Sequence, residues 1–482
     1  MSITNNLMPM VPELFLLGAT FALLLIDLFV TQARRGLTHF LALVVVIVTL
    51  TLILRGSDGV AVSTFGGMFL KDAPSDILKA FILITTGAAF IYAKQYLVDR
   101  GLFQGEFHVL CLFAALGMMI LVSAGNLVTV YLGLELLALS SYALVAMSRD
   151  SAVASEAAMK YFVLGAMASG MLLYGMSMIY GATGSLDLAT IHAASPDLGE
   201  NRMLMMFGVV FLIVGIAFKF GAAPFHMWLP DVYQGAPTAI TLFIGSAPKL
   251  AAFGMAWRLL EGGAGDFDAW WRDIIAWLAV ASLAVGNVIA IAQTNMKRML
   301  AYSTISHVGF LFLGLSNPSS VGYAAAMFYA ITYALMSAGA FATVILLSRN
   351  GYEAEQISDY AGLARKHPWQ GFLVLLLMAS LAGLPPMFGF WAKLAVLQAA
   401  VAGGMLWLAI VGVVFAVIGA YYYLRIIKVM YFDPVDDSSK AGLINDPQLR
   451  LLLSVNALLM LVLGLFSGPL IAWCQSAFGV SS

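Results

Sequence analysis

Apolar stretches separated by short polar segments recur along the whole chain. Each holds about 17–25 residues, which is the length that lets a helix cross a bilayer. The pattern predicts an all-α integral membrane protein with about 14 transmembrane helices. We expect these spans at residues 11–31, 38–54, 75–93, 106–124, 126–147, 155–181, 203–222, 237–259, 270–293, 298–316, 320–348, 370–402, 405–431 and 450–476. The stretch 370–402 is too long for one straight span.

The composition indicates that lipid is the solvent of this chain. Of its 482 residues, 62% are hydrophobic and 10% are charged, whereas soluble domains carry roughly 25% charged residues. A net charge of −1 argues against nucleic acid as a partner. Cys111 and Cys474 each stand alone in an apolar run, so disulfide, zinc and iron–sulfur sites are not expected.

The basic residues between the spans predict the orientation in the membrane. Arg34 and Arg35 follow the first apolar run, so that run is a retained span and not a cleaved signal peptide. If their loop is cytoplasmic, fourteen lysine and arginine residues lie on that side and five on the other, as the positive-inside rule requires. Both termini are then expected on the periplasmic side of a bacterial inner membrane. Five further lysines lie inside predicted spans: Lys79, Lys160, Lys219, Lys249 and Lys393.

Two halves of the chain share short motifs in the same order. AAMKY at 157–161 is matched by AAMFY at 325–329, and glycine and proline interrupt the spans at 221–224 and 383–386. A shift of five spans reverses orientation, so duplication would give two inverted five-helix repeats, spans 4–8 and 9–13, as in transport folds. The predicted domains are residues 1–105 (three N-terminal helices), 106–260 (first repeat, broken near 221–226), 270–431 (second repeat, broken near 383–390) and 432–482 (a loop and the last helix).

Four ionisable residues lie deep in the predicted spans or beside the breaks. Such a group at mid-membrane costs about 2.5–3.5 kcal/mol, so it is usually paired, hydrated or functional. Glu135 and Lys249 lie too far from either end of their spans to reach water. Lys219 precedes the first break and Lys393 follows the second, where disrupted backbone must face protein or water. We predict that these groups pass protons. The alternatives are a structural ion pair or a side chain that reaches the membrane surface.

Weaker candidates surround these four. Glu156 and Lys160 form an i, i+4 pair that position alone leaves equally structural and functional. Histidine passes protons near neutral pH, but a lone histidine in a span is often a packing residue. The remaining candidates, each with an alternative role as a packing or anchoring residue, are His226, His307, Tyr302 and Lys297.

Several motifs resemble the antiporter-like membrane subunits of respiratory complex I, the proton-pumping NADH–quinone oxidoreductase. The strongest is KFGAAPFHMWLPDVYQGAPTAITLFIGSAPKLAA at 219–252, and GLELLALSSYAL, SEAAMKYFVLGA, QTNMKRMLAYSTISHVGF and GLPPMFGFWAK extend the resemblance over essentially the whole chain. Among the three subunit types, DVYQGAPT and SAPKLA resemble the smallest, the N type.

The resemblance implies a role for each candidate. It implies Lys219 as the pumping lysine, Glu135 as its partner, Lys249 as a connecting lysine and Lys393 as the outlet. It also places in or near the proton path Glu156, Lys160, His226, Lys297, Tyr302 and His307. It implies no cofactor in this chain: flavin and iron–sulfur clusters belong to partner subunits. The expected partners are other complex I membrane subunits, lipid and protons.

Two other functions remain open. A multi-subunit cation/proton antiporter or a membrane-bound hydrogenase would use the same fold, and neighbouring genes would distinguish these from a redox-driven complex. A structural scaffold, in which the buried charges only hold helices together, is the second alternative.

Overall fold

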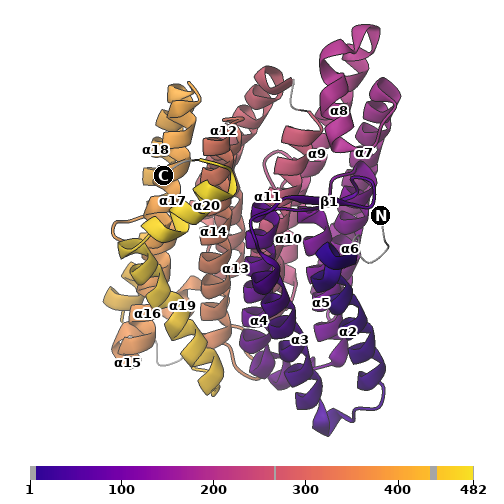
Figure 1. The fold of residues 1–482 in the computed structure, drawn as a ribbon. Coiled ribbons are helices and arrows are strands. Elements are labelled where there is room, and N and C mark those ends of the chain that lie inside the picture. The colour runs from indigo at the N-terminus through magenta and orange to yellow at the C-terminus, as the bar shows by residue number, and fades with distance from the viewer. Residues whose placement is uncertain (1–6, 265–266, 435–441, 481–482) are drawn as a thin grey trace. The chain divides into compact units, whose positions relative to one another are not determined.

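The computed structural model describes residues 7–264, 267–434 and 442–480. These residues form helices, apart from one hairpin of β1 (Val62–Thr64) and β2 (Phe69–Lys71). The predicted all-α membrane fold is therefore confirmed (Figure 1). Within the described residues, twelve helices are long and apolar enough to cross a membrane. Two predicted spans fall outside that group: the polar helix α13 (Met296–Leu315), and the stretch 370–402, which is divided into two short helices.

The chain divides into two compact units, each with its own set of helices. The first comprises residues 1–90, 104–220 and 247–275, and the second comprises 91–103, 221–246 and 276–482. The helices of the first unit are α2 (Val11–Asp27), α3 (Gly36–Gly56), α5 (Gly105–Val122), α6 (Leu127–Val145), α7 (Ala152–Thr183), α8 (Leu188–Ala194) and α9 (Arg202–Phe220).

The second unit contains the C-terminal half of the chain. Its helices are α10 (Trp228–Gly235), α13, α14 (Ser320–Leu347), α15 (Leu363–Lys366), α16 (Pro368–Ala382), α17 (Phe388–Ala402), α18 (Leu406–Phe432), α19 (Pro447–Leu465) and α20 (Gly468–Ala477). Three helices contribute residues to both units: α4 (Ala73–Asp99), α11 (Thr238–Trp257) and α12 (Asp268–Ala292).

Both predicted helix breaks are present. Helix α9 ends at Phe220, and Gly221 follows with φ +76°; α16 ends at Ala382, and Gly383 follows with φ +80°. Glycine takes this left-handed conformation without a Cβ clash, which is why helices so often stop at it. Each break also contains a cis X–Pro bond. The ends of α9 and α16 therefore leave backbone carbonyls without partners in their own helices.

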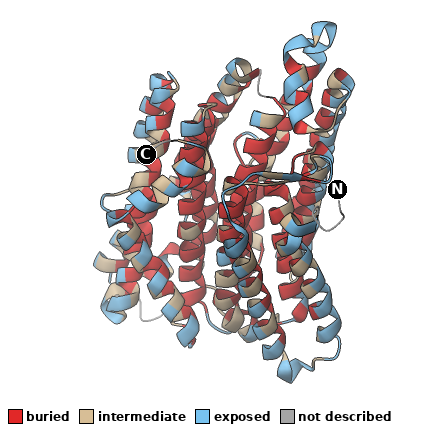
Figure 2. Cartoon of the chain, viewed as in Figure 1, coloured by how far each residue is buried: buried red, intermediate tan, exposed pale blue. Residues whose placement is uncertain are grey.

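Burial separates one pair of helices from the rest. In α13 every residue except Arg298 is buried, and α14 is buried along almost its whole length (Figure 2). By contrast, α7 and α18 expose large apolar side chains, among them Met167 and Val417. Exposed apolar residues suit a lipid or partner-facing surface, whereas the polar groups of α13 must find their partners within protein.

In the first unit, α5 and α6 pack backbone to backbone. A Cβ on Gly117 would lie 2.7 Å from the Leu137 nitrogen, and one on Gly133 would lie 2.8 Å from the Leu121 nitrogen. Neither contact leaves room for a side chain, so the two glycines set the distance between these helices.

We predict that Gly117→Ala lowers the free energy of unfolding by about 1–3 kcal/mol, because the methyl group forces α5 and α6 apart. Thermal unfolding of the purified protein in detergent measures this. The control is Gly170→Ala in α7, where a Cβ meets no atom within 4 Å. Equal unfolding temperatures for the two variants would contradict the packing argument.

Candidate functional site

Lys219, Glu135 and Ser169 lie in the first unit, on three different helices. Lys219 is at the end of α9, one residue before its last, and it is half-buried. The Glu135 carboxylate on α6 is the anion whose charge acts on Lys219. Ser169 on α7 donates a hydrogen bond to Glu135 Oε1. The structure therefore places the predicted acid–base pair of Glu135 and Lys219 within electrostatic reach of each other.

Lys249 satisfies the broken end of α9. It is 2% exposed on α11, and its Nζ donates a 2.7 Å hydrogen bond to the carbonyl of Phe220. That carbonyl belongs to the last residue of α9 and has lost its helical partner at the Gly221 break. A cation is also favoured at a helix C-terminus by the helix dipole. The charge of Lys219 acts on Lys249, so three ionisable groups follow one another in this unit.

Lys393 binds the carbonyls at the broken end of α16, in the second unit. Its Nζ donates to the carbonyls of Leu381, at 3.1 Å, and Ala382, at 2.8 Å. The ammonium also lies 5.0 Å from the ring centroid of Phe310. Each break is thus capped by a lysine from another helix: Lys249 from α11 and Lys393 from α17. Lys219 precedes the first break in the chain, whereas Lys393 follows the second.

His307 is the centre of a hydroxyl cluster in the second unit. Its Nδ1 lies 2.6 Å from the hydroxyl of Tyr329, and its Nε2 lies 3.1 Å from that of Tyr423. Tyr423 also shares a hydrogen bond with Ser303, and the charge of Lys393 acts on His307. Imidazole and hydroxyl groups both donate and accept hydrogen bonds, so this cluster has the chemistry of a proton wire.

Lys297 lies near the start of α13 and is 2% exposed. Its Nζ donates to the carbonyl of Ala236 at 2.8 Å and lies 3.4 Å from Oε1 of Glu355. Ala236 is the C-terminal cap of α10, so Lys297 also occupies a helix end. Tyr302 does not share these contacts of Lys297. It lies against Arg298, whose guanidinium carbon is 5.9 Å from the centroid of the Tyr302 ring.

The other predicted residues are less enclosed. Glu156 and Lys160 form an ion pair of 2.8 Å, with side chains 67% and 43% exposed. His226 is half-buried in the segment between α9 and α10. The structure therefore does not bring these three residues into the buried lysine contacts described above.

The in-span lysine Lys79 has a structural explanation. Lys79, for which the sequence offered no role, lies 2.7 Å from Glu13, and both side chains are 2% exposed. Within the described ranges, no group of three or more histidine, cysteine or acidic side chains is placed to hold a metal ion.

Sequence reasoning missed several polar residues that contact the predicted ones. Ser169 is a small polar residue in an apolar span, and Tyr329 and Tyr423 have the pattern of ordinary aromatic residues in such spans. Glu353 and Glu355 lie in a polar loop, where acidic residues are common. Spacing along the chain gives no signal for them, because each meets its partner through the tertiary fold.

The chain is similar to known respiratory membrane proteins. Residues 124–419 match the family described as NADH:quinone oxidoreductase/Mrp antiporter, TM. NADH-quinone oxidoreductase subunit N of Xanthomonas euvesicatoria pv. vesicatoria (strain 85-10) is 58% identical over 476 residues, 98% of this chain and 97% of that one. The subunit N of Thiobacillus denitrificans (strain ATCC 25259 / T1) is 52% identical over 473 residues, 98% of each chain.

Solved structures share the fold. A chain of respiratory complex I from Thermus thermophilus with bound aureothin has a TM-score of 0.82 and 32% identity, covering 96% of this chain and 98% of that one. A chain of the Mrp complex from Dietzia sp. DQ12-45-1b has a TM-score of 0.85 at 22% identity, covering 99% and 97%. The second similarity concerns the fold alone.

We predict that Gly383→Ala destabilises the protein through Lys393. The new Cβ would lie 2.7 Å from Lys393 Cδ, so the side chain must move away from the carbonyls that it caps. The control is Gly404→Ala, because Gly404 has φ +78° but a Cβ there meets nothing within 4 Å. Both changes carry the left-handed backbone cost of about 1–2 kcal/mol. Gly383→Ala should lose a further ~1–3 kcal/mol from the broken hydrogen bonds, measured by thermal unfolding. Equal losses would mean that Lys393 does not hold the break.

Proposed function

We propose that this chain, which belongs to the NADH:quinone oxidoreductase/Mrp antiporter family and within it to the N subunits of NADH-quinone oxidoreductase, conducts protons for that complex. Electron transfer from NADH to quinone would occur in partner subunits, which would carry the flavin and the iron–sulfur clusters. This chain would couple that reaction to proton movement across the membrane.

One observation carries the proposal: the buried lysines at the helix breaks bind neutral carbonyls. Lys249 donates to Phe220, and Lys393 donates to Leu381 and Ala382. A carbonyl accepts a hydrogen bond from either the ammonium or the neutral amine, so this contact survives when the lysine loses its proton. Such a lysine keeps its position while its proton comes and goes.

Charge coupling between neighbours would drive the movement. In the first unit the charge of Glu135 acts on Lys219, and that of Lys219 acts on Lys249. Where water is excluded, the arrival of a proton on one group changes the proton affinity of the next. In the second unit, Lys393 stands in the same relation to His307, whose hydroxyl partners would carry the proton onward.

The remaining candidate residues would act at the entrance of the proton path and at the surface of the chain. Lys297 would admit protons near the start of α13, and His226 would exchange them at the first break. Tyr302 would act through its contact with Arg298. The exposed pair of Glu156 and Lys160 would pass the coupling signal at the surface of the chain.

The proposal includes the repeat structure of the chain and its orientation in the membrane. We take residues 106–260 and 270–431 as inverted repeats, preceded by three helices at 1–105 and followed by 432–482, part of which lies outside the described residues. From the excess of basic residues we infer that both termini face the periplasm, with the chain in the bacterial inner membrane beside the other antiporter-like subunits.

The decisive variant is Lys219→Arg, in the assembled complex. Arginine keeps the positive charge but does not release its proton. The rate of proton pumping should therefore fall at least about tenfold, which corresponds to an increase of roughly 1.4 kcal/mol or more in the barrier height. Fluorescence quenching in membrane vesicles during NADH oxidation measures pumping. Lys366→Arg, at an exposed lysine, is the matched control and should leave pumping unchanged.

The scaffold alternative makes the opposite prediction. If the charges only hold helices together, Lys219→Arg should pump normally once assembled, since the charge is retained. Normal pumping in that variant would refute the role proposed for Lys219.

A further inference from the structure

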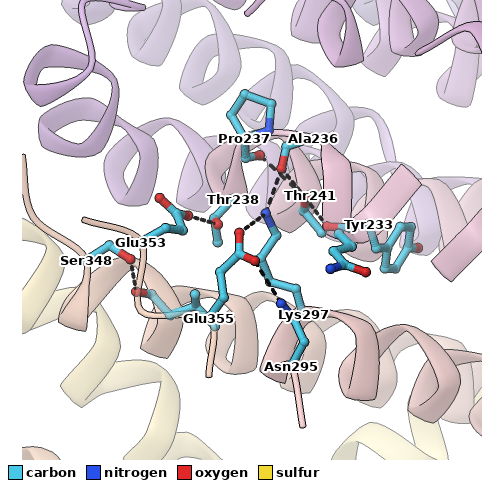
Figure 3. A network of polar contacts seen from close by, with 12 residues as sticks. Tyr233, Ala236, Pro237, Thr238, Thr241, Asn295, Lys297, Ser348, Glu353 and Glu355 are labelled. Carbon is cyan, nitrogen blue, oxygen red and sulfur yellow. Dashed lines mark hydrogen bonds and ion pairs between the residues drawn. The ribbon is translucent and has the colours of Figure 1, made fainter. Parts of the chain in front are cut away.

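We propose that Glu355 delivers protons from the aqueous edge of the chain to buried Lys297. This inference rests on the proposed proton-conducting function and adds to it the group that loads the entrance. It concerns the second unit, where a polar loop lies against the start of α13 (Figure 3).

Backbone pairing fixes the position of Glu355. The Met296 N–H donates to the carbonyl of Glu355, and the Ile357 N–H donates to the carbonyl of Thr294 at 2.9 Å. Asn295, the N-cap of α13, donates through Nδ2 to Glu355 Oε2 at 2.8 Å. The carboxylate is therefore held beside the positive end of the α13 dipole, where an anion is favoured. The Glu355 side chain therefore has a defined position beside α13.

Exposure changes sharply between the two partners. The Glu355 side chain is 26% exposed and that of Lys297 is 3% exposed, with 3.4 Å between Oε1 and Nζ. Glu355 thus reaches water while touching an amine that does not. The Ala236 carbonyl, 2.8 Å from Nζ, holds the amine in place on its other side, as Figure 3 shows.

The neighbouring carboxylate, Glu353, is bound in a different way. Its oxygens accept hydrogen bonds from the hydroxyls of Tyr96 and Thr238, and its ion pair with Arg100 is close. These donors contact both oxygens of the Glu353 carboxylate. Glu353 therefore holds the loop in place, whereas Glu355 has one oxygen held by Asn295 at 2.8 Å and the other in a longer, 3.4 Å contact with Lys297, through which a proton can pass.

The transfer requires only these two side chains and water. Glu355 takes a proton from water at its carboxylate oxygen. When Lys297 is the neutral amine, the carboxyl O–H bond breaks and a new N–H bond forms at Nζ. Glu355 returns to the carboxylate and Lys297 to the ammonium, so charge and protons balance.

Glu355→Gln tests the transfer in the assembled complex. Glutamine retains the size and the hydrogen bonding but cannot take up a proton, so pumping per complex should fall by at least about fivefold, which is close to 1 kcal/mol in barrier height. Glu355→Asp, which keeps a carboxylate, should recover most of the activity and show a larger solvent deuterium isotope effect, because its proton must cross a longer gap. Glu106→Gln, at an exposed glutamate paired with Arg35, is the control for loss of a surface charge and should pump normally.

The outcomes separate this inference from the proposed function. Normal pumping in Glu355→Gln with loss in Lys219→Arg would overturn the role of Glu355 alone. Normal pumping in both would overturn the proposed function itself. If Glu355→Gln fails to assemble, Glu355→Asp decides: pumping without any rise in its isotope effect would contradict the transfer.

Discussion

A helix that stops inside a membrane leaves carbonyl oxygens that water cannot reach. Two lysines of this chain supply the missing donors: Lys249 at the end of α9 and Lys393 at the end of α16. Lys297 makes the same kind of contact with the cap of α10, near the aqueous edge of the chain. The same contact therefore holds the fold together at its irregular points and places an amine there. The proposed proton transfer would use the same atoms that stabilise the helix ends, so a structural and a functional role for these lysines are compatible.

Burial of α13 extends the same reasoning to neutral groups. A helix with nearly every residue inside protein must satisfy its hydroxyl and imidazole groups there. Ser303 and His307 do so through Tyr423, and Thr304 does so through Tyr333 at 2.7 Å. Enclosure thus produces hydrogen-bonded groups that donate and accept: one cluster around His307, and the pair of Thr304 and Tyr333. Burial alone accounts for these hydrogen bonds, and the proposed proton transfer would use them.

The sequence predicted what local chemistry determines. The long apolar runs and the Gly–Pro interruptions gave the spans and both breaks, and the motifs gave the family, which the similarity to N subunits confirms. It did not predict the interruption between α19 and α20, although Ser467, Gly468 and Pro469 stand at that point of the apolar run. Nor did it predict the partners of the site residues. His307 meets a tyrosine 116 positions away, and Lys297 meets Glu355 at a separation of 58, and no periodicity in one sequence encodes such pairs. The roles of the site residues remain predictions.

The position of His307 between two phenols has a consequence for the direction of transport. Tyr329 and Tyr423 present the same kind of group to the two ring nitrogens, so a proton meets similar chemistry whichever way it travels. A symmetrical segment of this kind is reversible: it equilibrates its two ends and favours neither. If the cluster conducts protons as proposed, the direction of transport must come from charged groups outside it, such as Lys393. Under a sufficiently large opposing proton gradient, protons would then pass through the same residues in the reverse direction.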